Sequence, residues 1–528
     1  MKASDYQSLP GMFFQMAKEH PKRDFLSIKE DGRWKSKTWR QSADEVRHLA
    51  TGLKHLGIQP GERVALISEN RPEWVIAELA IMAIGAIAVP AYTTNTTSDH
   101  SHILTNSGAS AAIVSTRALA KRLLPAALES TSCRFVVTIE PLLIQQKLET
   151  DVHVYDAVLA TGKDKGNKEN KLVDEGLEDL RQEDAAVLIY TSGTGGAPKG
   201  VVLSHRAILT NCMGANEVLA DWSLRHESFL SFLPLSHAYE HMAGLHFPIS
   251  LGATIYFAES VDKLVENMGE VKPTIMTAVP RLHEAIRTKI IRGLEKQGQD
   301  GGKGKLQKQL FDRTIELGRM KAEGKTLSTG QKIQDRVLER LVRAKIRNRF
   351  GGRLKAMVSG GAALNEEVGL FFESIGLCIL QGYGQTEAAP LLTVNRRNPN
   401  KLETVGPAVK GVTLKIAHDG EVIAQGGNLM NGYWKNDKAT NETIIDGWLH
   451  TGDIGELDAD GYLTITDRKK DIIVNSGGDN VSPARIEGFL TLENEIGQAM
   501  VYGDKKPNLV AIIVPDQEFL NEWCKANN

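Results

Sequence analysis

A glycine-rich stretch at residues 190–200 combines hydroxyl side chains with one lysine and could bind a polyphosphate. It reads Tyr-Thr-Ser-Gly-Thr-Gly-Gly-Ala-Pro-Lys-Gly, and the apolar run from Ala185 to Tyr190 before it has the pattern of a buried strand. Glycine permits positive-φ turns in which several backbone N–H groups converge on one anion. Side chains in the stretch add further donors, from Thr191, Ser192, Thr194 and Lys199. The stretch is therefore predicted to bind phosphate groups.

Two common nucleotide-binding loops do not fit this stretch. A Walker loop requires Gly-Lys followed by Ser or Thr, whereas Pro198 precedes Lys199 and Gly200 follows it. A Rossmann fingerprint requires three glycines that open a helix, whereas here Ala-Pro and then a strand follow the glycines. The alternative to an anion-binding loop is the flexible tip of a hairpin.

The stretch resembles, almost letter for letter, the Tyr-Thr-Ser-Gly-Thr-Thr-Gly-x-Pro-Lys-Gly loop of the adenylate-forming (AMP-binding) superfamily. That superfamily contains acyl-CoA ligases, luciferases and the adenylation domains of peptide synthetases. One departure is Gly196, where the family often has Thr-Gly at the paired positions. The resemblance implies that the bound polyphosphate is ATP, and that its phosphates contact Thr191, Ser192, Gly193, Thr194, Gly195 and Lys199.

The composition is that of an ordinary globular protein and argues against several partners. The chain has 528 residues, 41% hydrophobic and 24% charged, with a net charge of −2. This balance gives no general attraction to nucleic acid or acidic membranes. The N-terminus lacks the apolar run of a signal peptide, so we expect a soluble, cytoplasmic protein. The cysteine spacing indicates neither a zinc site nor a disulfide framework: Cys133, Cys212, Cys378 and Cys524.

Strands and helices alternate along the first half of the sequence, which predicts an α/β fold with parallel sheets covered by helices. The resemblance implies a large N-terminal domain, 1–466, of two helix-covered β-sheets plus a small β-barrel-like subdomain at about 401–466. An incomplete small α+β domain follows at 467–528. The charged segment 163–183 is expected to be an exposed connection. The periodicity predicts helices at 9–19, 42–56 and 72–84, and strands at 24–29, 32–38, 63–67, 86–90 and 229–235.

The segment Leu233-Pro-Leu-Ser-His-Ala-Tyr-Glu240 follows a predicted strand and resembles the acyl-pocket segment of the superfamily's long-chain branch. The resemblance assigns His237, Tyr239, His241, Ser359 and Gly360 to this pocket. For either histidine alone, a satisfied structural role is the alternative. No Asp lies between Ser236 and Val261 to pair with a substrate ammonium, which favours a plain carboxylic acid over an amino acid.

Three later segments resemble the family's nucleotide-binding motifs: 355–364, 377–389 and 446–456. Tyr383 would stack on adenine, and Asp453 would accept hydrogen bonds from the ribose hydroxyls. A carboxylate beside a phosphate repels it unless a cation lies between them, so Glu387, with Thr191, is assigned to Mg²⁺. The alternatives are that Glu387 only stabilises the start of a helix and that Asp453 only stabilises a turn. The remaining implied ATP or AMP contacts are Gly361, Ala362, Gln381, Gly382, Gly384, Thr386, Ile465 and Arg468.

The last part of the chain resembles the mobile small domain of the superfamily. Asp467 would be its hinge, and Ser476, Gly477 and Gly478 would line the channel for coenzyme A. The family's small domain continues to a lysine that contacts the α-phosphate, and the sequence ends at Asn528 before it. We therefore expect either a shortened chain or a protein that is weak in the first step.

The resemblance implies a fatty acyl-CoA ligase, long-chain in type, that uses ATP, Mg²⁺ and coenzyme A. Thr191, Lys199, Thr386 and Glu387 would be its catalytic residues. Alternatives are an acyl-AMP ligase, an aryl-acid ligase, and a non-catalytic nucleotide- or acyl-binding module. The basic segment 287–355 is either a set of solvated helices or a peripheral contact with the inner membrane face. Monomer and homodimer both remain open.

Overall fold

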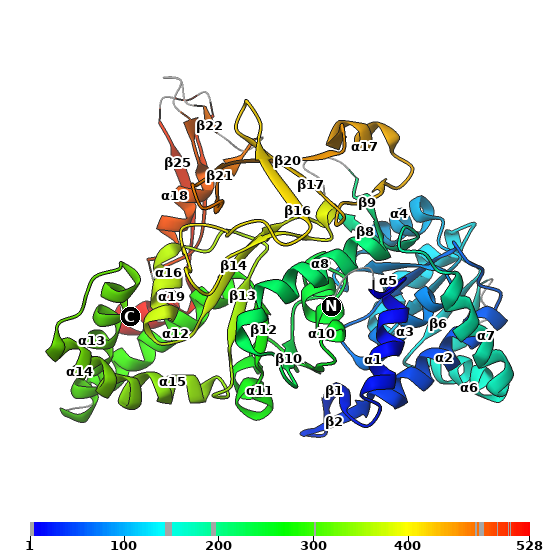
Figure 1. Cartoon of the computed structure of the whole chain (residues 1–528), viewed down its shortest axis with the longest axis horizontal. Helices are drawn as coiled ribbons and strands as arrows, with labels where there is room; N and C mark the ends of the chain where they lie inside the picture. The colour runs from blue at the N-terminus through cyan, green and yellow to red at the C-terminus, as the bar shows by residue number, and fades with distance from the viewer. Residues whose placement is uncertain are drawn as a thin grey trace.

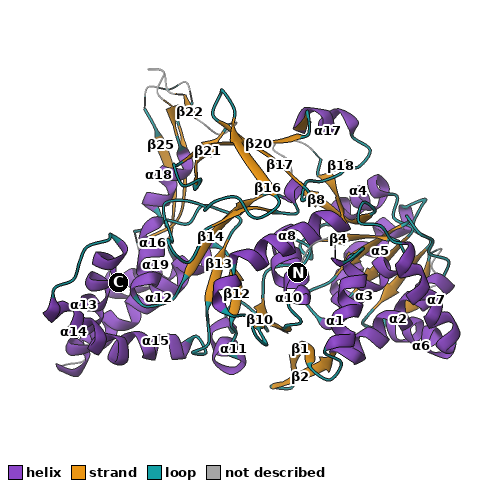
Figure 2. Ribbon diagram, viewed as in Figure 1, coloured by secondary structure: helices purple, strands orange, loops and turns teal. Residues whose placement is uncertain are grey.

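The structure is a computed structural model that describes residues 5–142, 150–191, 197–299, 302–469, 473–474, 480–493, 495–504, 506 and 508–527. Two eight-stranded sheets form its centre, and helices pack around both of them (Figures 1 and 2). A smaller antiparallel sheet lies above them in the view of Figure 1, next to the last part of the chain. The predicted α/β class and two helix-covered sheets are thus confirmed.

The first sheet has the strand order β18-β9-β8-β4-β3-β5-β6-β7. Its centre is parallel, while β9 runs antiparallel to both β8 and β18. Helices connect the parallel strands because strands that run the same way need a crossover. The strands are β3 (Arg63–Ile67), β4 (Ile87–Ala91), β5 (Ala111–Val114), β6 (Phe135–Thr138), β7 (Asp151–Val154), β8 (Ala185–Thr191), β9 (Lys199–Ser204) and β18 (Gly432–Tyr433). The helices are α2 (Trp39–His55), α3 (Pro72–Ala83), α4 (Thr97–Ser107), α5 (Arg117–Glu129), α6 (Tyr155–Asp164), α7 (Gly166–Asp179) and α8 (His205–Val218).

The second sheet has the order β15-β14-β13-β12-β10-β11-β1-β2, parallel from β14 to β1 with antiparallel edges. Its strands are β1 (Asp24–Glu30), β2 (Arg33–Thr38), β10 (Ser228–Ser231), β11 (Thr254–Phe257), β12 (Ile275–Ala278), β13 (Ala356–Ser359), β14 (Ile379–Gly384) and β15 (Leu391–Val394). Its helices include α1 (Leu9–Glu19), α9 (Ala238–Glu240), the π-helix η3 (His241–His246), α10 (Phe247–Ser250), α11 (Leu264–Val271) and α16 (Glu366–Ser374).

The third sheet matches the predicted small β subdomain. It is antiparallel, and β20 pairs with three of its strands. Its strands are β16 (Val412–Ile416), β17 (Glu421–Gly426), β19 (Ile444–Ile445), β20 (Trp448–Leu457) and β21 (Leu463–Arg468), with α17 (Asp437–Thr443) beside them. The last elements are β22 (Ile473–Val474), β23 (Asn480–Val481), α18 (Pro483–Leu490), β24 (Ile496–Tyr502), β25 (Val510–Pro515) and α19 (Gln517–Asn527).

Helices α12 to α15 form the flank seen at the left of Figure 1 and carry the basic segment. They are α12 (Pro280–Gln299), α13 (Gly302–Ala322), α14 (Thr329–Leu338), a π-turn η4 (Glu339–Arg343) and α15 (Ala344–Arg349). Residues 329–349 are helical throughout, in α14, η4 and α15. Among the described residues, no helix has both the length and the apolar composition needed to cross a membrane.

Three predicted boundaries or elements differ from the structure. Helix α2 begins three residues early, because Thr38 and Gln41 form a reciprocal capping box at its N-terminus. Most described side chains of 163–183 are exposed, as expected, but α6 and α7 occupy most of the segment and Val173 is buried against the core. One apolar anchor on a charged helix was enough for packing. Strand β10 ends at Ser231, four residues before the predicted end.

Candidate active site

A cavity of about 1300 Å³ opens where the two large sheets meet the antiparallel sheet. Its wall combines the ends of β8 and β9, the turn after β13, the end of β14, and parts of β18, β20 and β21. Strands of different sheets end here, so side chains far apart in sequence face one space. The predicted residues that line it are Thr191, Lys199, His237, Tyr239, Gly360, Gly361, Gly382, Tyr383, Gly384, Thr386, Glu387 and Arg468.

The first polar group of the cavity joins Lys199 to Glu387 through Tyr433. Strand β18 pairs with β9, with Tyr433 opposite Val201, and this pairing places the Tyr433 ring beside the lysine. Lys199 Nζ lies 4.8 Å from the centre of that ring. The Tyr433 hydroxyl donates to Glu387 Oε1 at 2.7 Å. A lysine, a phenol and a carboxylate are therefore held together on one wall.

Tyr433 was missed by the sequence analysis, because no motif that it considered includes this residue. Burial and the neighbouring Glu387 carboxylate raise the pKa of the Tyr433 hydroxyl, so it remains a donor at neutral pH. Only strand pairing across the sheet reveals its role, because β9 and β18 are distant in sequence.

The second polar group is centred on the Asp453 carboxylate. Tyr383 donates its hydroxyl to Asp453 Oδ2 at 2.6 Å, and Arg468 Nε lies 3.2 Å from Oδ1. Asp453 and Arg468 are paired across β20 and β21. Burial and Asp453 raise the pKa of Tyr383 well above its ordinary value. Each carboxylate oxygen has two lone pairs, so Asp453 can still accept hydrogen bonds from a diol.

An apolar wall formed by Tyr239 and Gly360 faces the same cavity. The Tyr239 hydroxyl donates to the Val358 carbonyl at 2.7 Å, which fixes the ring. His237 Nδ1 accepts the Tyr239 backbone N–H at 3.1 Å, and burial lowers the pKa of His237 so that it is neutral. A Cβ on Gly360 would lie 3.1 Å from the Tyr239 ring, so glycine here keeps room beside the aromatic face.

Several predicted site residues lie outside the cavity lining. The Gln381 side chain braces loops instead, through the Leu364 N–H and the carbonyls of Leu402 and Thr404. His241 is buried against Glu78, and Ser359 is fully buried. Ala362, Asp453 and Ile465 are also absent from the lining residues, and Asp453 is reached from the cavity through Tyr383 and Arg468. Strand alternation explains Gln381, because its neighbour Gly382 faces the cavity.

Two predicted segments fall outside the described residues: Ser192, Gly193, Thr194 and Gly195 of the phosphate loop, and Ser476, Gly477 and Gly478 of the proposed coenzyme A channel. The flanks of the phosphate loop are described. Thr191 ends β8, and Lys199 begins β9 directly opposite it. Asp467 lies near the end of β21 and pairs with Ile454.

Helix α4 contacts the two described flanks of the phosphate loop through residues that sequence reasoning missed. His102 Nε2 lies 2.9 Å from the Pro198 carbonyl oxygen, and the Tyr190 hydroxyl donates to Asn106 Oδ1 at 2.7 Å. One contact is on each side of the loop. The two described flanks of the loop are therefore held by a helix far away in the sequence, with 96 positions between His102 and Pro198.

A third charged group lies at the rim and was also missed. Lys469 Nζ pairs with Asp419 Oδ2 at 2.6 Å and Glu421 Oε2 at 3.1 Å, and His450 Nδ1 lies 3.1 Å from Glu421. Lys469 follows Arg468 directly. Two neighbouring cations therefore tie the end of β21 to β17 and β20.

Comparison with known proteins places this chain in one family. Residues 13–434 match the family described as AMP-binding enzyme. The chain is 34% identical over 532 residues to the long-chain-fatty-acid–CoA ligase FadD15 of Mycobacterium tuberculosis, covering 99% of this chain and 84% of that protein. It is 30% identical to long chain acyl-CoA synthetase 4 of Arabidopsis thaliana, with coverages of 98% and 79%.

A solved structure shows the same fold. The A domain of carboxylic acid reductase from Segniliparus rugosus, solved with AMP and a co-purified carboxylic acid, aligns with a TM-score of 0.73 at 20% identity. The alignment covers 98% of this chain and 83% of that one. Sequence relatives, family match and fold agree, and the chain belongs to the AMP-binding enzyme family.

Proposed function

We propose that this chain is a long-chain fatty-acid–CoA ligase that forms an acyl adenylate from ATP and then an acyl-CoA. The observation that carries the proposal is that Lys199, Glu387 and Tyr383 line one cavity, and that Tyr383 donates a hydrogen bond to the buried Asp453. The named activity of its relatives supports the fatty-acid substrate and coenzyme A.

In the first step, a carboxylate oxygen of the acid attacks the α-phosphorus of ATP, and the bond to pyrophosphate breaks. In the resulting mixed anhydride the acyl carbon carries a phosphate as its leaving group, in place of oxide, which is a poor leaving group. Lys199 would neutralise charge on the phosphates, and Asp453 and Tyr383 would hold the ribose and the purine. Thr191 and Thr386 would donate hydrogen bonds from their hydroxyl groups to the phosphates. Catalysis on this wall is therefore positioning together with electrostatic stabilisation.

The cavity wall also fits Mg²⁺. Glu387 gives one oxygen to Tyr433, and its other oxygen has no hydrogen-bond partner in the described part of the chain. Thr191 adds a hydroxyl on the same cavity. Magnesium prefers one or two carboxylates with substrate phosphates and water, which these residues allow. When bound, the ion would supply positive charge to the phosphate oxygens.

In the second step, the thiol sulfur of coenzyme A attacks the acyl carbon, and AMP leaves. We propose Asp467 as the hinge between a domain at 1–466 and a small domain at 467–528, with Ser476, Gly477 and Gly478 in the coenzyme A channel. The paired cations Arg468 and Lys469 hold the residues beside this hinge to the antiparallel sheet. A rotation about the hinge would have to break these contacts.

The assignment is tested by acyl-CoA formation with saturated acids of increasing chain length, with benzoate and an aryl series as the comparison. We expect kcat/KM to rise toward long chains. Turnover confined to benzoates would replace the lipid assignment by an aryl-acid ligase. Acyl-AMP release without thioester would indicate an acyl-AMP ligase, and binding of ATP and acid without pyrophosphate exchange would indicate a non-catalytic module.

We further propose that the enzyme is cytoplasmic and contacts the inner membrane face through α14 and η4. Ile333, Val337 and Leu341 are 61%, 48% and 45% exposed at a spacing of four residues. Exposed basic side chains accompany them, from Lys332, Arg336 and Arg340. Such a face suits a surface of anionic lipid.

Sedimentation with vesicles tests this contact. We expect binding to phosphatidylglycerol-containing vesicles, little binding to pure phosphatidylcholine, and a loss on Val337→Asp. Val261→Asp is the matched control, because Val261 is also 61% exposed and lies elsewhere. Equal sedimentation with both vesicle types would remove the proposal and leave solvated helices.

A further inference from the structure

Three titratable side chains that the proposed reaction does not use meet in the protein core. They are Glu78 from α3 and His241 and His246 from η3, all buried, and their ligand atoms lie within 4.8 Å of one another. His241 Nε2 is 2.5 Å from Glu78 Oε1, and His246 Nε2 is 3.5 Å from Glu78 Oε2. Helix α3 belongs to the first sheet and η3 follows β10 of the second, so the cluster joins two layers.

The backbone of η3 is built to place both histidines on one side. It is a π-helix, whose wide turn brings residues five apart onto the same face. At 3.6 residues per turn an α-helix would separate them. The two ring centroids are instead 4.7 Å apart. Gly244 is required in this turn, since a Cβ there would lie 2.2 Å from Glu240 Oε1.

The polar atoms of the cluster are only partly satisfied. Both ring nitrogens of His246 and Glu78 Oε2 are buried without a hydrogen-bond partner among the described residues. An unpaired buried polar atom destabilises the folded state. The neighbouring carboxylate of Glu240 is treated differently, because it accepts hydroxyl hydrogen bonds from Ser231 at 2.6 Å and Thr277 at 2.5 Å. The Glu240 carboxylate thus accepts hydrogen bonds from hydroxyl groups, whereas the described polar contacts of the Glu78 carboxylate are with imidazole rings.

We propose that Glu78, His241 and His246 form a buried site for a divalent first-row transition-metal ion, with Zn²⁺ as the best match. Two imidazole nitrogens and one carboxylate oxygen are an established zinc donor set, with water in the fourth position. Zinc ligands lie about 2.0–2.2 Å from the ion, so the three atoms need only small shifts to share one.

The ion would act on the fold rather than on the reaction. It would join α3 to η3, and η3 directly follows the α9 turn that carries Tyr239 of the cavity wall. The site would thus fix that wall to the first sheet. The inference depends on the cluster alone and stands or falls separately from the proposed ligase activity.

Metal content of the untagged full-length protein tests the site. After expression with zinc and a wash with a weak chelator, we expect about one zinc ion per wild-type chain. His246→Gln should lower this content about tenfold or more. His283→Gln is the matched control, because His283 is equally buried and packs against Phe372 away from the cluster. Zinc well below one ion per wild-type chain, or equal zinc in His246→Gln, would overturn the proposal.

A second measurement covers the case in which His246→Gln does not fold. Wild-type protein prepared with Co²⁺ should show visible absorption bands of cobalt bound by nitrogen and oxygen ligands, and its unfolding midpoint should rise when the ion is bound. Cobalt-treated wild type without visible bands would contradict the site regardless of the variants.

Discussion

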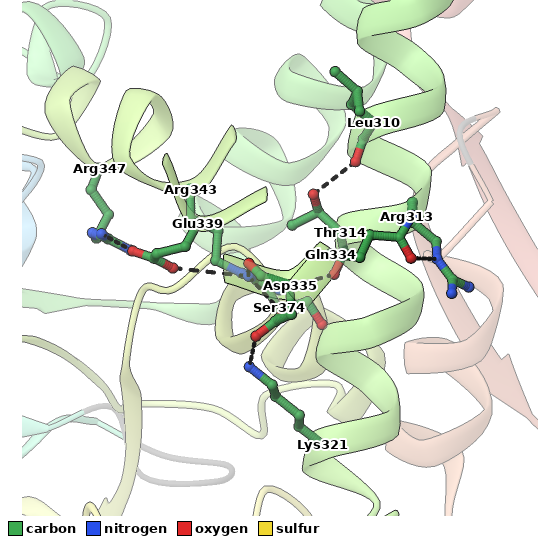
Figure 3. A network of polar contacts seen from close by, with 10 residues as sticks. All are labelled: Leu310, Arg313, Thr314, Lys321, Gln334, Asp335, Glu339, Arg343, Arg347 and Ser374. Atoms are coloured by element: carbon green, nitrogen blue, oxygen red, sulfur yellow. Dashed lines mark hydrogen bonds and ion pairs between the residues drawn. The ribbon is translucent and has the colours of Figure 1, made fainter. Parts of the chain in front are cut away.

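Two networks of charged side chains in this protein differ in how completely they are neutralised. On the helical flank, Arg343 is buried and donates to the Ser374 carbonyl at 2.7 Å, to Asp335 Oδ1 at 2.9 Å and to the Thr314 carbonyl at 3.3 Å (Figure 3). Lys321 pairs with Asp335, and Arg347 with Glu339. Every charge in this network meets an opposite charge or a carbonyl.

The cavity wall shows the opposite arrangement. The described contact of Lys199 is the face of an aromatic ring, and the described partner of Glu387 is one phenol. A folded protein that needed only stability would have paired these charges, as the helical flank does. Charged side chains that are incompletely neutralised around a large cavity leave room for an anionic ligand and its cation to bind. Charged side chains that lack a full set of partners, rather than charged side chains in general, therefore identify the site.

The largest effect should come from opening the closed network. Arg343→Ala removes one of the two cations that pair with Asp335 and all hydrogen bonds of a buried guanidinium, so we expect the free energy of unfolding to fall by about 3–5 kcal/mol. Denaturant unfolding measures this change. The kcat/KM of the folded fraction should stay close to wild type. A loss of activity without a loss of stability would mean that the flank belongs to the site.

Removing the open charge should have the converse effect. Lys199→Ala should lower the rate of adenylate formation by about 10²–10³-fold, because one electrostatic contact to the phosphates is lost. Pyrophosphate exchange measures this rate, with unfolding followed in parallel. Lys308→Ala is the control, since Lys308 is exposed and pairs only with Asp312. Equal rates of pyrophosphate exchange in the two variants would show that Lys199 takes no part in adenylate formation.

Measuring stability against pH tests the burial of a neutral side chain within the helical flank. Burial lowers the pKa of His283 on α12 from 6.5 to about 4. The unfolded chain binds this proton first as pH falls, so the stability that His283 contributes is present above about 6.5 and is lost down to about 4. The loss amounts to about 3 kcal/mol. His283→Leu should flatten the stability-versus-pH curve relative to wild type in this window. Parallel curves would show that His283 is not buried as a neutral ring.

The smallest effect concerns the phenol that links the two charges of the cavity. Tyr433→Phe keeps the ring beside Lys199 and removes the hydrogen bond to Glu387, so we expect about 1 kcal/mol of lost stability or transition-state binding. Tyr462→Phe is a suitable control, because its hydroxyl donates to the Pro399 carbonyl outside the cavity lining. A drop in adenylation as large as that of Lys199→Ala would mean that Tyr433 does more than orient the carboxylate.

The sequence by itself determined the chemical types at the site and the strand-to-turn plan that carries them. Lys199, Tyr383, Glu387 and Arg468 were named from local motifs, and all four line the cavity. Local patterns suffice here because each group stands close to a strand terminus: Lys199 begins β9, Tyr383 and Glu387 lie on either side of the end of β14, and Arg468 ends β21.

Tertiary structure decided which residues complete the site and which only support it. Tyr433 reaches Lys199 through pairing of β9 with β18, Gln381 faces away from the cavity to brace three backbone groups, and His241 binds Glu78 in the core. These roles depend on strand pairing and on the wide turn of η3. Both are set by contacts between residues distant in sequence, so no local pattern encodes them.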